Sequence, residues 1–372
     1  MIFDCIVVGA GPAGASAAYH LAKRGRSVLL LEKHSLPRYK PCGGGVPSTV
    51  SQWFEFDFSP VVDQTVKNVQ FTWKLGDPID AYLTTPEPMW MVKRDAFDHF
   101  LVQQAQQQGA ELRENTAATG IEFKGDRWQI NTSNGSVEGR YLIAADGADG
   151  PMSQWLGFKA SKRRQGFTLE GNDPQGNHTA RFEFGMVKNG FIWSFPKSNG
   201  CSISAATLRG GKSADLHKLL LEYASKTGIQ VTQAPQEYSI CVWDGEQPLH
   251  TQQAVLVGEA ACVVDPITGE GIRPSIYTGV QAAAAIDQAL AGNANALADY
   301  TQTINREIGS DLVWAQRISG LFYQFPGLGY KLLKRPTAAE RIGQFLCGQI
   351  RYSDVAGRIM KRLSGGLIPG IG

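Results

Sequence analysis

The distribution of apolar residues along the chain predicts an α/β protein that begins with a buried strand. The run FDCIVV at residues 3–8 is short and continuously apolar, as in a parallel strand covered on both faces. The segment GAGPAGASAAYHLAKRG then predicts a turn and a helix that stops at Gly25, and SVLLLE predicts a second strand. Apolar residues four positions apart predict another helix in KRDAFDHFLVQQAQQQGAEL, and residues 118–143 predict three short strands.

From about residue 155 to 250 the pattern changes to alternating apolar and polar positions, as in antiparallel strands. Strands are predicted in TARFEFGMV, GFIWSFP, GCSISAATL and EYSICVW, with a helix in ADLHKLLLEYASKTG. An earlier pair of alternating strands, VQFTWKLGDPIDAYLTT, is predicted around a Gly-Asp-Pro turn. AVLVGEAA and GVQAAAAIDQALAG predict a return to a buried strand and a helix, and the remainder is helical with breaks at Pro326 and Pro336.

This order of elements predicts a discontinuous nucleotide-binding domain with a second domain inserted in two places. The overall class is α/β (α+β overall), because a βαβ unit and a run of antiparallel strands occur in one chain. The Rossmann-like domain takes residues 1–65, 92–155 and 251–300, and the mainly antiparallel, substrate-binding domain takes 66–91 and 156–250. Residues 301–372 form a helical C-terminal region.

Composition and charge restrict the location and the partners. No run of about 20 apolar residues predicts a membrane span. Six cysteines without a C-x-x-C pair argue against a metal site or a disulfide framework and favour a reducing, cytoplasmic location. The net charge is +2, but residues 301–372 hold ten Lys/Arg against four Asp/Glu. This basic region is either a solvated helical face or a contact with an anionic membrane surface, and we expect no nucleic-acid partner.

A G-x-G-x-x-G pattern lies between the first strand and the first helix, where it favours dinucleotide binding. Its first glycine permits a tight turn, the second lets the backbone approach a pyrophosphate, and the third lets helix and strand pack closely. Glu32 ends the next strand and suits the hydroxyls of an adenosine ribose. The predicted cofactor contacts in this unit are Gly9, Gly11, Ala13, Gly14, Glu32 and Lys33. The alternative is a tight turn that binds nothing.

Two later segments resemble flavoprotein hydroxylases of the para-hydroxybenzoate hydroxylase-like fold. LIAADGADG is similar to their strand-end Asp-Gly segment, and VLVGEAACVVDPITGEGI to their second flavin fingerprint, with Glu259 in place of the usual aspartate. Arg94, followed by Asp98, matches the R-x-x-x-D helix that carries an arginine towards FAD in this class. The resemblance implies FAD as cofactor, held by Arg94, Asp146, Gly147, Gly258, Glu259, Pro266, Gly269, Gly271 and Ile272. The bare backbone at the last glycines and the helix dipole from Ile272 suit a flat, reducible ring.

Two further motifs resemble one branch of this class, the geranylgeranyl reductase family. They are KPCGGG at residues 40–45 and GFIWSFP at residues 190–196. The resemblance implies an FAD-dependent oxidoreductase that reduces isolated double bonds of an isoprenoid chain on a lipid, a chlorophyll precursor or a quinone. The position of the first motif after the βαβ unit places Cys42, Gly43 and Gly44 at the flavin, with Gly45 beside the substrate. Trp193 and Phe195, on alternate positions of a strand, and Tyr277, one turn into the helix after the last glycines, are expected at the substrate. Cys42 and Tyr277 are the candidate proton donors. The alternative for Cys42 is a small apolar residue that fills space, and the alternative for Trp193 and Phe195 is ordinary packing in the core of the sheet.

Other functions stay open at this point. An FAD-dependent monooxygenase or hydroxylase would use the same fold, and a flavin-containing lipid or pigment carrier would bind without turnover. The chain shows no separate nicotinamide-binding fold. The electron donor is therefore expected to be either NADPH that binds transiently or a ferredoxin. A hydrophobic isoprenoid substrate would reside in a membrane, on which RIGQFLCGQIRYSDVAGRIMKRL would rest without spanning it. The protein is therefore expected to be cytoplasmic and peripheral on a membrane.

Overall fold

The N-terminal βαβ unit forms as predicted. The computed structural model describes residues 1–83, 89–174, 176, 178–210 and 215–355. β1 (Ile2–Val8) leads through the glycine turn into α1 (Pro12–Lys23), and β2 (Val28–Leu31) returns parallel to β1. α1 starts at a proline, which suits the first turn because its missing N–H would have no partner there. Its small residues let it pack closely against α5 (Ile272–Leu290).

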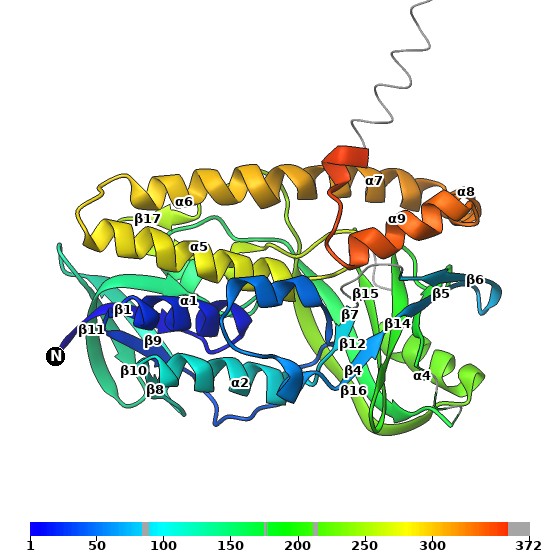
Figure 1. The fold of residues 1–372 in the computed structure, drawn as a ribbon, viewed down its shortest axis with the longest axis horizontal. Coiled ribbons are helices and arrows are strands. Elements are labelled where there is room, and N and C mark those ends of the chain that lie inside the picture. Colours follow the sequence, from blue (N-terminus) through cyan, green and yellow to red (C-terminus); the bar gives the residue numbers. More distant parts are fainter. Residues whose placement is uncertain (84–88, 175, 177, 211–214, 356–372) are drawn as a thin grey trace, which may run out of the picture.

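β1 and β2 belong to an eight-stranded sheet in the order β17-β18-β11-β1-β2-β8, which β10 and β9 extend from β11. The strands are β8 (Glu111–Arg113), β9 (Ala118–Phe123), β10 (Trp128–Thr132), β11 (Gly135–Ala144), β17 (His250–Thr251) and β18 (Ala254–Leu256). β11 pairs in parallel with β1 and β18, so the three strand ends that carry the glycine and acidic motifs meet at one edge. α1, α2 (Arg94–Gln107) and α5 lie over one face of this sheet (Figure 1).

The antiparallel segments form a second, seven-stranded sheet in the order β16-β12-β15-β14-β13-β5-β6. Its strands are β5 (Asn68–Trp73), β6 (Gly76–Tyr82), β12 (Arg163–Asn172), β13 (Ala180–Phe184), β14 (Gly190–Lys197), β15 (Gly200–Thr207) and β16 (Gln230–Cys241). All neighbours are antiparallel except β13 and β5, which come from separate stretches of the chain. α4 (Leu216–Thr227) packs on β12, β15 and β16.

A small sheet in the order β3-β7-β4 lies between the two large ones. It consists of β3 (Gly45–Pro47), β4 (Gln64–Val66) and β7 (Met89–Met91). β3 directly follows the KPCGGG motif, so this sheet fixes the far end of the glycine loop. Short helical turns at Ser48–Trp53 and Ser59–Val61 connect β3 to β4, and α3 (Met152–Trp155) follows the Asp-Gly segment.

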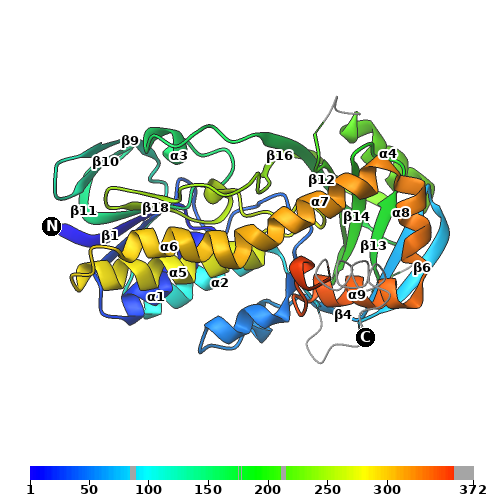
Figure 2. The same cartoon turned by 90° about the horizontal axis from the view of Figure 1, so that it is seen from above.

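The C-terminal region is helical and joins both large sheets. It comprises α6 (Ala296–Ile304), a π turn (Asn305–Gly309), α7 (Ser310–Gln324), α8 (Pro326–Leu333) and α9 (Pro336–Leu346). The predicted breaks are confirmed, since Pro326 and Pro336 each open a new helix. α7 crosses from the nucleotide-binding part to the inserted sheet, above which α8 and α9 lie (Figure 2). Within the described part of the chain, every helix is too short or too polar to cross a bilayer.

Two local expectations were wrong. The β5–β6 turn lies at Lys74 and Leu75, both with positive φ, rather than at the Gly-Asp-Pro sequence, which is part of β6. The carboxylate of Glu183 on the neighbouring β13 explains this, because it accepts the N–H groups of Lys74 and Leu75 at 2.7 and 2.9 Å. This distant residue satisfies the turn's backbone donors and so selects its position.

The second correction concerns the cysteines. Cys241 at the end of β16 and Cys262, after the 3-10 turn Gly258–Ala261, form a disulfide, with their Cα atoms 4.5 Å apart. The sequence predicted no disulfide framework, because 21 residues separate the two and no motif marks them as a pair. The bond ties the inserted sheet to the second nucleotide fingerprint.

Candidate active site

One cavity of about 440 Å³ runs between the two large sheets. Its walls come from the first glycine turn, the loop that carries KPCGGG, the start of α2, the Asp-Gly segment after β11, the turn before α5, and β14. Residues of the C-terminal segment, Phe345, Leu346, Ile350 and Tyr352, close another side. The cavity therefore brings together segments that are far apart in the sequence.

The first glycine turn has the shape that a bound pyrophosphate needs. Gly9 has φ +107°, and a Cβ there would lie 2.4 Å from the carbonyl oxygen of Ala145. A Cβ on Gly11 would meet nothing closer than 4.0 Å, so this backbone opens into the cavity. Gly11 also precedes α1 without any side chain that caps the helix, which leaves N–H groups at the positive end of the dipole.

A series of side chains of alternating charge connects Glu32, the carboxylate predicted to bind the ribose, to α2. Glu32 is 4% exposed, and its carboxylate accepts the N–H groups of Ala10 and His34 at 3.2 and 3.1 Å. Arg38 lies between Glu32, at 3.4 Å, and Asp98, at 2.9 Å. Asp98 is fully buried and also holds Arg94 through two 2.8 Å hydrogen bonds. The carboxylate of Asp98 thus fixes both arginines at the cavity wall.

Asp146, the acid of the Asp-Gly segment, has one oxygen without a partner. Its Oδ2 accepts the N–H of Met152 at 2.8 Å, whereas Oδ1 is buried and has no hydrogen-bond partner among the described residues. Burial raises the pKa of Asp146 to about 6, against the lowering effect of the Met152 N–H. A buried oxygen at the cavity wall without a donor is suited to a hydroxyl or N–H group of a ligand.

The second fingerprint forms a tight turn in front of α5. The carboxylate of Asp265 accepts the N–H groups of Ile267 and Thr268 at 2.7 and 3.2 Å, which shapes the turn. Gly269, with φ +71°, lines the cavity, and Gly271 precedes α5 without a capping side chain. The N-termini of α1 and α5 therefore both face the cavity, but the carboxylate of Glu270 accepts the N–H of Arg273 in the first turn of α5 at 2.7 Å.

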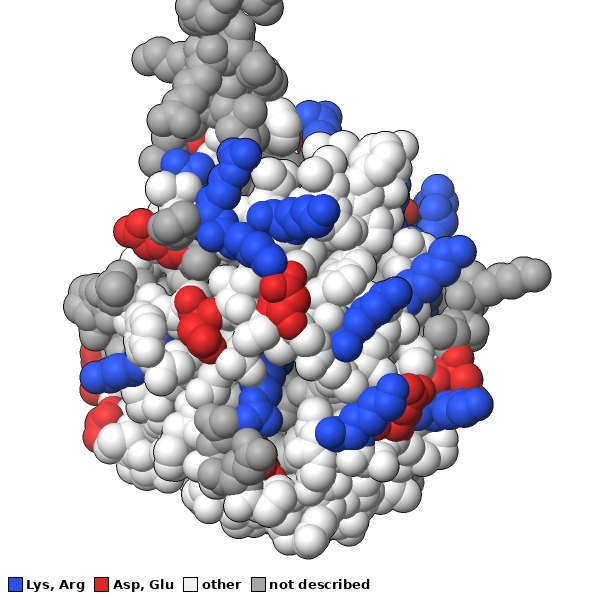
Figure 3. Space-filling view, turned by 90° about the vertical axis from the view of Figure 1, so that its right-hand side faces the viewer, with Lys and Arg blue, Asp and Glu red and all other residues white. Residues whose placement is uncertain are grey.

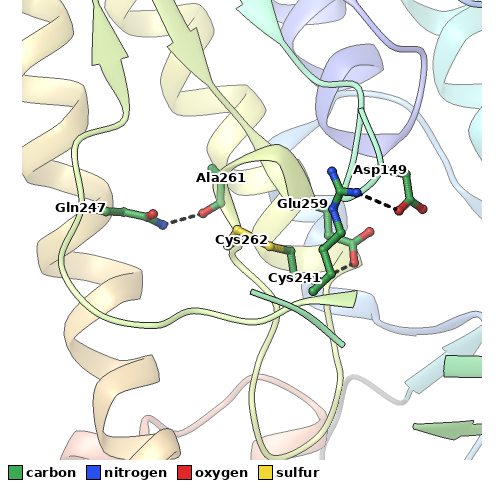
Figure 4. Close-up of a disulfide and its surroundings, with 7 residues drawn as sticks. Asp149, Cys241, Gln247, Glu259, Ala261 and Cys262 are labelled. Atoms are coloured by element: carbon green, nitrogen blue, oxygen red, sulfur yellow. Dashed lines mark hydrogen bonds and ion pairs between the residues drawn. A yellow bond between two sulfur atoms is a disulfide. The ribbon is translucent and has the colours of Figure 1, made fainter. Parts of the chain in front are cut away.

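Glu259, which replaces the family's aspartate, lines the cavity beside the disulfide. One of its oxygens accepts the N–H of Cys241 at 3.3 Å, as Figure 4 shows. Burial raises the pKa of Glu259, while Lys40 and this N–H lower it. The disulfide holds the donor of this hydrogen bond in place, because Cys241 is the residue bonded to Cys262.

These features fit FAD. The uncapped N-terminus of α1 suits the phosphates, the glycine turn before α5 suits the ring, Glu32 suits the ribose, and the buried Oδ1 of Asp146 can accept a hydrogen bond from the cofactor. The following predicted FAD residues line the cavity: Gly9, Gly11, Ala13, Glu32, Lys33, Cys42, Gly43, Gly44, Arg94, Asp146, Gly147, Glu259, Gly269, Gly271 and Ile272.

Gly14, Gly258 and Pro266 do not line the cavity. A Cβ on Gly14 would lie 1.9 Å from the carbonyl oxygen of Gly9, so this glycine serves helix–strand packing. Gly258 packs on Ala13, and the carbonyl of Pro266 accepts a hydrogen bond from Ser319. Their predicted roles as direct contacts are therefore corrected to roles in shaping the turns.

The assignment of Tyr277 is also corrected. Tyr277 is not among the cavity residues. Its hydroxyl donates to Glu307 of the π turn, and its ring packs on Trp53. Its position one turn into α5 suggested that it faced the ring, but the helix rotation directs it towards the α6–α7 junction. The structure therefore does not bring Tyr277 together with the other candidate residues that line the cavity.

The glycine triplet lies directly under the aromatic pair of β14. A Cβ on Gly43 would lie 2.6 Å from Trp193 Nε1 and 2.8 Å from Phe195 Cδ2, and one on Gly45 would lie 2.8 Å from Phe195. Gly44 has φ +76°, and its Cβ would lie 2.1 Å from the carbonyl oxygen of Val92. Only glycines allow this loop to fit between β14 and the start of α2.

A buried lysine holds the same loop from below. The ammonium of Lys197, the last residue of β14, donates to the carbonyl oxygens of Gly43 and Val92, both at 2.7 Å. Burial lowers the pKa of Lys197, although Cys42 and Glu170 act in the opposite direction. Sequence reasoning missed Lys197, even though it directly follows the GFIWSFP motif.

Cys42 lies in the cavity wall between cationic and phenolic groups. Its Sγ accepts the N–H of Gly44 at 3.3 Å, and Cys42 is among the groups that raise the pKa of Arg94. Ser202 donates to the Cys42 carbonyl at 3.3 Å. Tyr238 of β16 also lines the cavity, and no motif around it signalled this. The structure thus places the thiol beside the glycine loop and next to Arg94.

The comparisons with known proteins agree with this site. Residues 3–171 match the family described as an FAD binding domain. An uncharacterised protein of Methanosarcina barkeri is 31% identical over 341 residues, which cover 89% of this chain and 86% of that protein. Digeranylgeranylglycerophospholipid reductase 1 of Methanothermobacter thermautotrophicus is 27% identical over 335 residues, with 83% and 84% of the two chains covered.

Solved structures share the fold. A geranylgeranyl bacteriochlorophyll reductase-like protein of Thermoplasma acidophilum superimposes with a TM-score of 0.78 at 21% identity, over 94% of this chain and 92% of that one. The flavin-dependent brominase Bmp2 has a TM-score of 0.72 at 17% identity, over 98% and 100% of the two chains. The α/β fold class is confirmed, and the protein belongs to the geranylgeranyl reductase family of FAD-dependent oxidoreductases.

Proposed function

We propose that the protein reduces isolated C=C bonds of an isoprenoid chain carried by a membrane lipid, a chlorophyll precursor or a quinone. The observation that carries this is the apolar wall against the glycine loop, where Trp193 and Phe195 lie directly against Gly43 in the lining of the cavity. Relatives named for the reduction of a digeranylgeranyl glycerophospholipid support a lipid chain as the first substrate class to test.

The physical basis is hydrocarbon burial. Beyond the aromatic pair, Phe182, Met89 and Val264 continue the apolar wall. A buried CH₂ group contributes about 0.8 kcal/mol, so a long isoprenoid chain binds such a wall without a polar anchor. The same wall excludes water from the reacting carbons, which protects a reduced cofactor and strengthens local electrostatics.

When bound and reduced, FAD supplies a hydride to one alkene carbon. Gly11 and Gly271 would face it with free backbone N–H groups, and Glu32, Asp146 and Glu259 would accept hydrogen bonds from its polar chain. Lys197 orients the glycine loop between the cofactor and substrate regions through its bond to the Gly43 carbonyl. NADPH or a ferredoxin is the proposed electron donor.

The second alkene carbon needs a proton, and we assign its transfer to the Cys42 thiol. Tyr238 also lines the cavity and carries a proton, as do Tyr39 and Tyr352. Burial raises the pKa of Tyr238 above its ordinary value, and the nearby Cys42 adds to this effect. Giving up the phenolic proton is therefore unfavourable, and Tyr238 acts as a fixed hydrogen-bond donor instead.

The test is an anaerobic incubation of the FAD-loaded protein with chemically reduced flavin and geranylgeranyl-bearing phospholipids, chlorophyll precursors and quinones. Each reduced bond adds two hydrogens to the product mass. Cys42→Ala should retain FAD and slow product formation, and Tyr238→Phe should slow it less. No mass gain with any substrate class would refute the reductase assignment; full activity of Cys42→Ala would remove the thiol from the reaction. Flavin reduction by NADPH or by reduced ferredoxin then identifies the donor.

Two other functions are distinguished by repeating the incubation in air with measurement of dioxygen. An FAD-dependent monooxygenase or hydroxylase would consume dioxygen and insert oxygen into its product, and a carrier would give no product. The halogenase-like neighbours share the fold, but the only cation that β14 directs to the glycine loop, Lys197, is engaged by two backbone carbonyls among the described residues. This favours a structural role for that lysine.

A further inference from the structure

Large apolar side chains are exposed at the junction of α7 and α8. Leu321, Phe325, Leu328 and Leu332 have exposed fractions of 66, 54, 60 and 45%. Leu321 lies in the last turn of α7, Phe325 at the junction, and Leu328 and Leu332 in α8. Isolated exposed leucines are common on protein surfaces, but a run of four over two helices indicates a surface that contacts something apolar.

α8 is firmly attached to the protein through its opposite face. Tyr330 is buried, and its hydroxyl donates to the carbonyl oxygens of Phe71 and Asp77 at 3.0 and 2.6 Å. Its ring packs on Trp73, and Lys334 pairs with Asp77. Leu328 and Leu332 are therefore exposed on a helix that is already packed against the rest of the protein.

The exposed face of α8 carries cations as well as apolar residues. Lys331 and Leu332 are exposed three and four residues after the exposed Leu328, which places them on one face of α8, and the exposed Arg335 directly precedes α9. Residues 312–343 contain five Lys/Arg and one Asp/Glu. Figure 3 views this end of the molecule, where Lys and Arg side chains border a broad uncharged surface.

A shallow depression adjoins this surface beside Leu321. It is lined by Arg209, Arg317 and polar atoms of α7. Guanidinium groups match the geometry of phosphate oxygens, which suits a lipid headgroup next to an apolar insertion. Apolar side chains flanked by cations are the pattern of a helix that lies in the interface of an anionic bilayer.

We propose that the α7–α8 surface, defined by Leu321, Phe325, Leu328, Lys331, Leu332 and Arg335, docks the protein on an anionic lipid bilayer. The expected membrane segment at residues 341–363 is thereby revised. Of its described part, Gly343, Cys347 and Tyr352 are buried, and Tyr352 donates to Asp265 at the cavity; residues 356–363 lie outside the described residues. α9 leads directly from the docking surface to these cavity residues, so a substrate chain that leaves the bilayer would have a short route to the site.

The experiment is vesicle co-sedimentation of the full-length, FAD-loaded protein without substrate, so it does not depend on the proposed reaction. We expect binding to vesicles of phosphatidylglycerol and phosphatidylcholine, and weaker binding to phosphatidylcholine alone. Phe325→Ser/Leu328→Ser/Leu332→Ser should lower the partition coefficient at least about tenfold, because these side chains lose apolar burial. Lys331→Glu/Arg335→Glu should lower it about tenfold on anionic vesicles only.

Matched controls come from α4 on another part of the inserted sheet. Leu221→Ser removes a 38% exposed leucine and Lys218→Glu reverses an exposed cation, and both should bind as the wild type does. Wild-type binding that none of the α7–α8 substitutions reduces would overturn the proposal. A wild-type dimer that dissociates in the triple variant, with vesicle binding unchanged, would instead make this face a contact between two copies. Vesicle binding without reductase activity would refute the proposed function alone.

Discussion

The buried carboxylate of Asp146 is expected to lower the stability of the protein without cofactor while it strengthens the binding of FAD. Its Oδ1 is buried and has no hydrogen-bond partner in the part of the chain that the structure describes, and burial raises the pKa of the carboxyl group from 3.8 to about 6. Between pH 3.8 and about pH 6 the carboxyl group therefore keeps its proton in the folded state and loses it in the unfolded state. The free energy of unfolding consequently falls as the pH rises through this range. Above the folded pKa the full penalty applies; two units at 1.36 kcal/mol per unit give on the order of 3 kcal/mol.

Asp146→Asn keeps the shape and removes the charge. The apo variant should unfold at higher urea concentration than the apo wild type at about pH 8, by up to about 3 kcal/mol. At about pH 5 only about half of this difference should remain, because the wild-type carboxyl is then largely protonated in the fold. Taking the difference between the two chains removes the contributions of all other titrating groups.

Saturating FAD should narrow the stability difference between the two proteins at about pH 8, because a tenfold difference in affinity corresponds to about 1.4 kcal/mol. A charged acceptor contributes more to a hydrogen bond than an amide does, so Asp146→Asn should bind FAD about tenfold more weakly. Asp126→Asn, at a carboxylate that is 77% exposed in a turn of the same sheet, is the control and should change neither property. A stability difference that is flat with pH, or an unchanged FAD affinity, would refute the reasoning about this oxygen.

Three further substitutions test other parts of the site. Asp98→Ala should lower the unfolding free energy by about 3–5 kcal/mol in urea titrations, since it leaves Arg94 and Arg38 without their buried partner; a loss below about 1 kcal/mol would contradict a desolvated pair. Gly44→Ala should keep the protein folded but slow turnover at least tenfold. The control is Gly25→Ala, which has the same φ of +76° and no described neighbour within 4 Å; it should lower the unfolding free energy by only about 1 kcal/mol and leave turnover unchanged. Equal effects of the two substitutions would exclude the contact with Val92. Cys262→Ser should lower the unfolding free energy by about 3 kcal/mol for a closed loop of this length, and reductant should do the same to the wild type only; insensitivity of the wild type to reductant would contradict the disulfide.

The sequence by itself determined the fold class and the cofactor region. Gly9, Gly11 and the turn before α5 are specified locally, because a tight turn and an open helix N-terminus require particular residues at fixed spacing whatever surrounds them. The helix starts at Pro326 and Pro336 are local for the same reason. The position of the β5–β6 turn was predicted wrongly, because the donors of Lys74 and Leu75 are satisfied by Glu183, more than a hundred residues away.

Only the tertiary structure decided which side chains share the cavity. Lys197 and Tyr238 are ordinary strand residues in the sequence, and they become part of the site because β14 and β16 present one face to the glycine loop. Tyr277 was misplaced because helical spacing gives the period of a helix but not its rotation about its own axis. The pairing of Cys241 with Cys262 and the exposed face of α8 likewise depend on where long-range packing brings each element. Turns and helix ends depend on neighbouring residues and can be predicted from them. A surface shared by several elements depends on long-range contacts, which no local sequence pattern predicts.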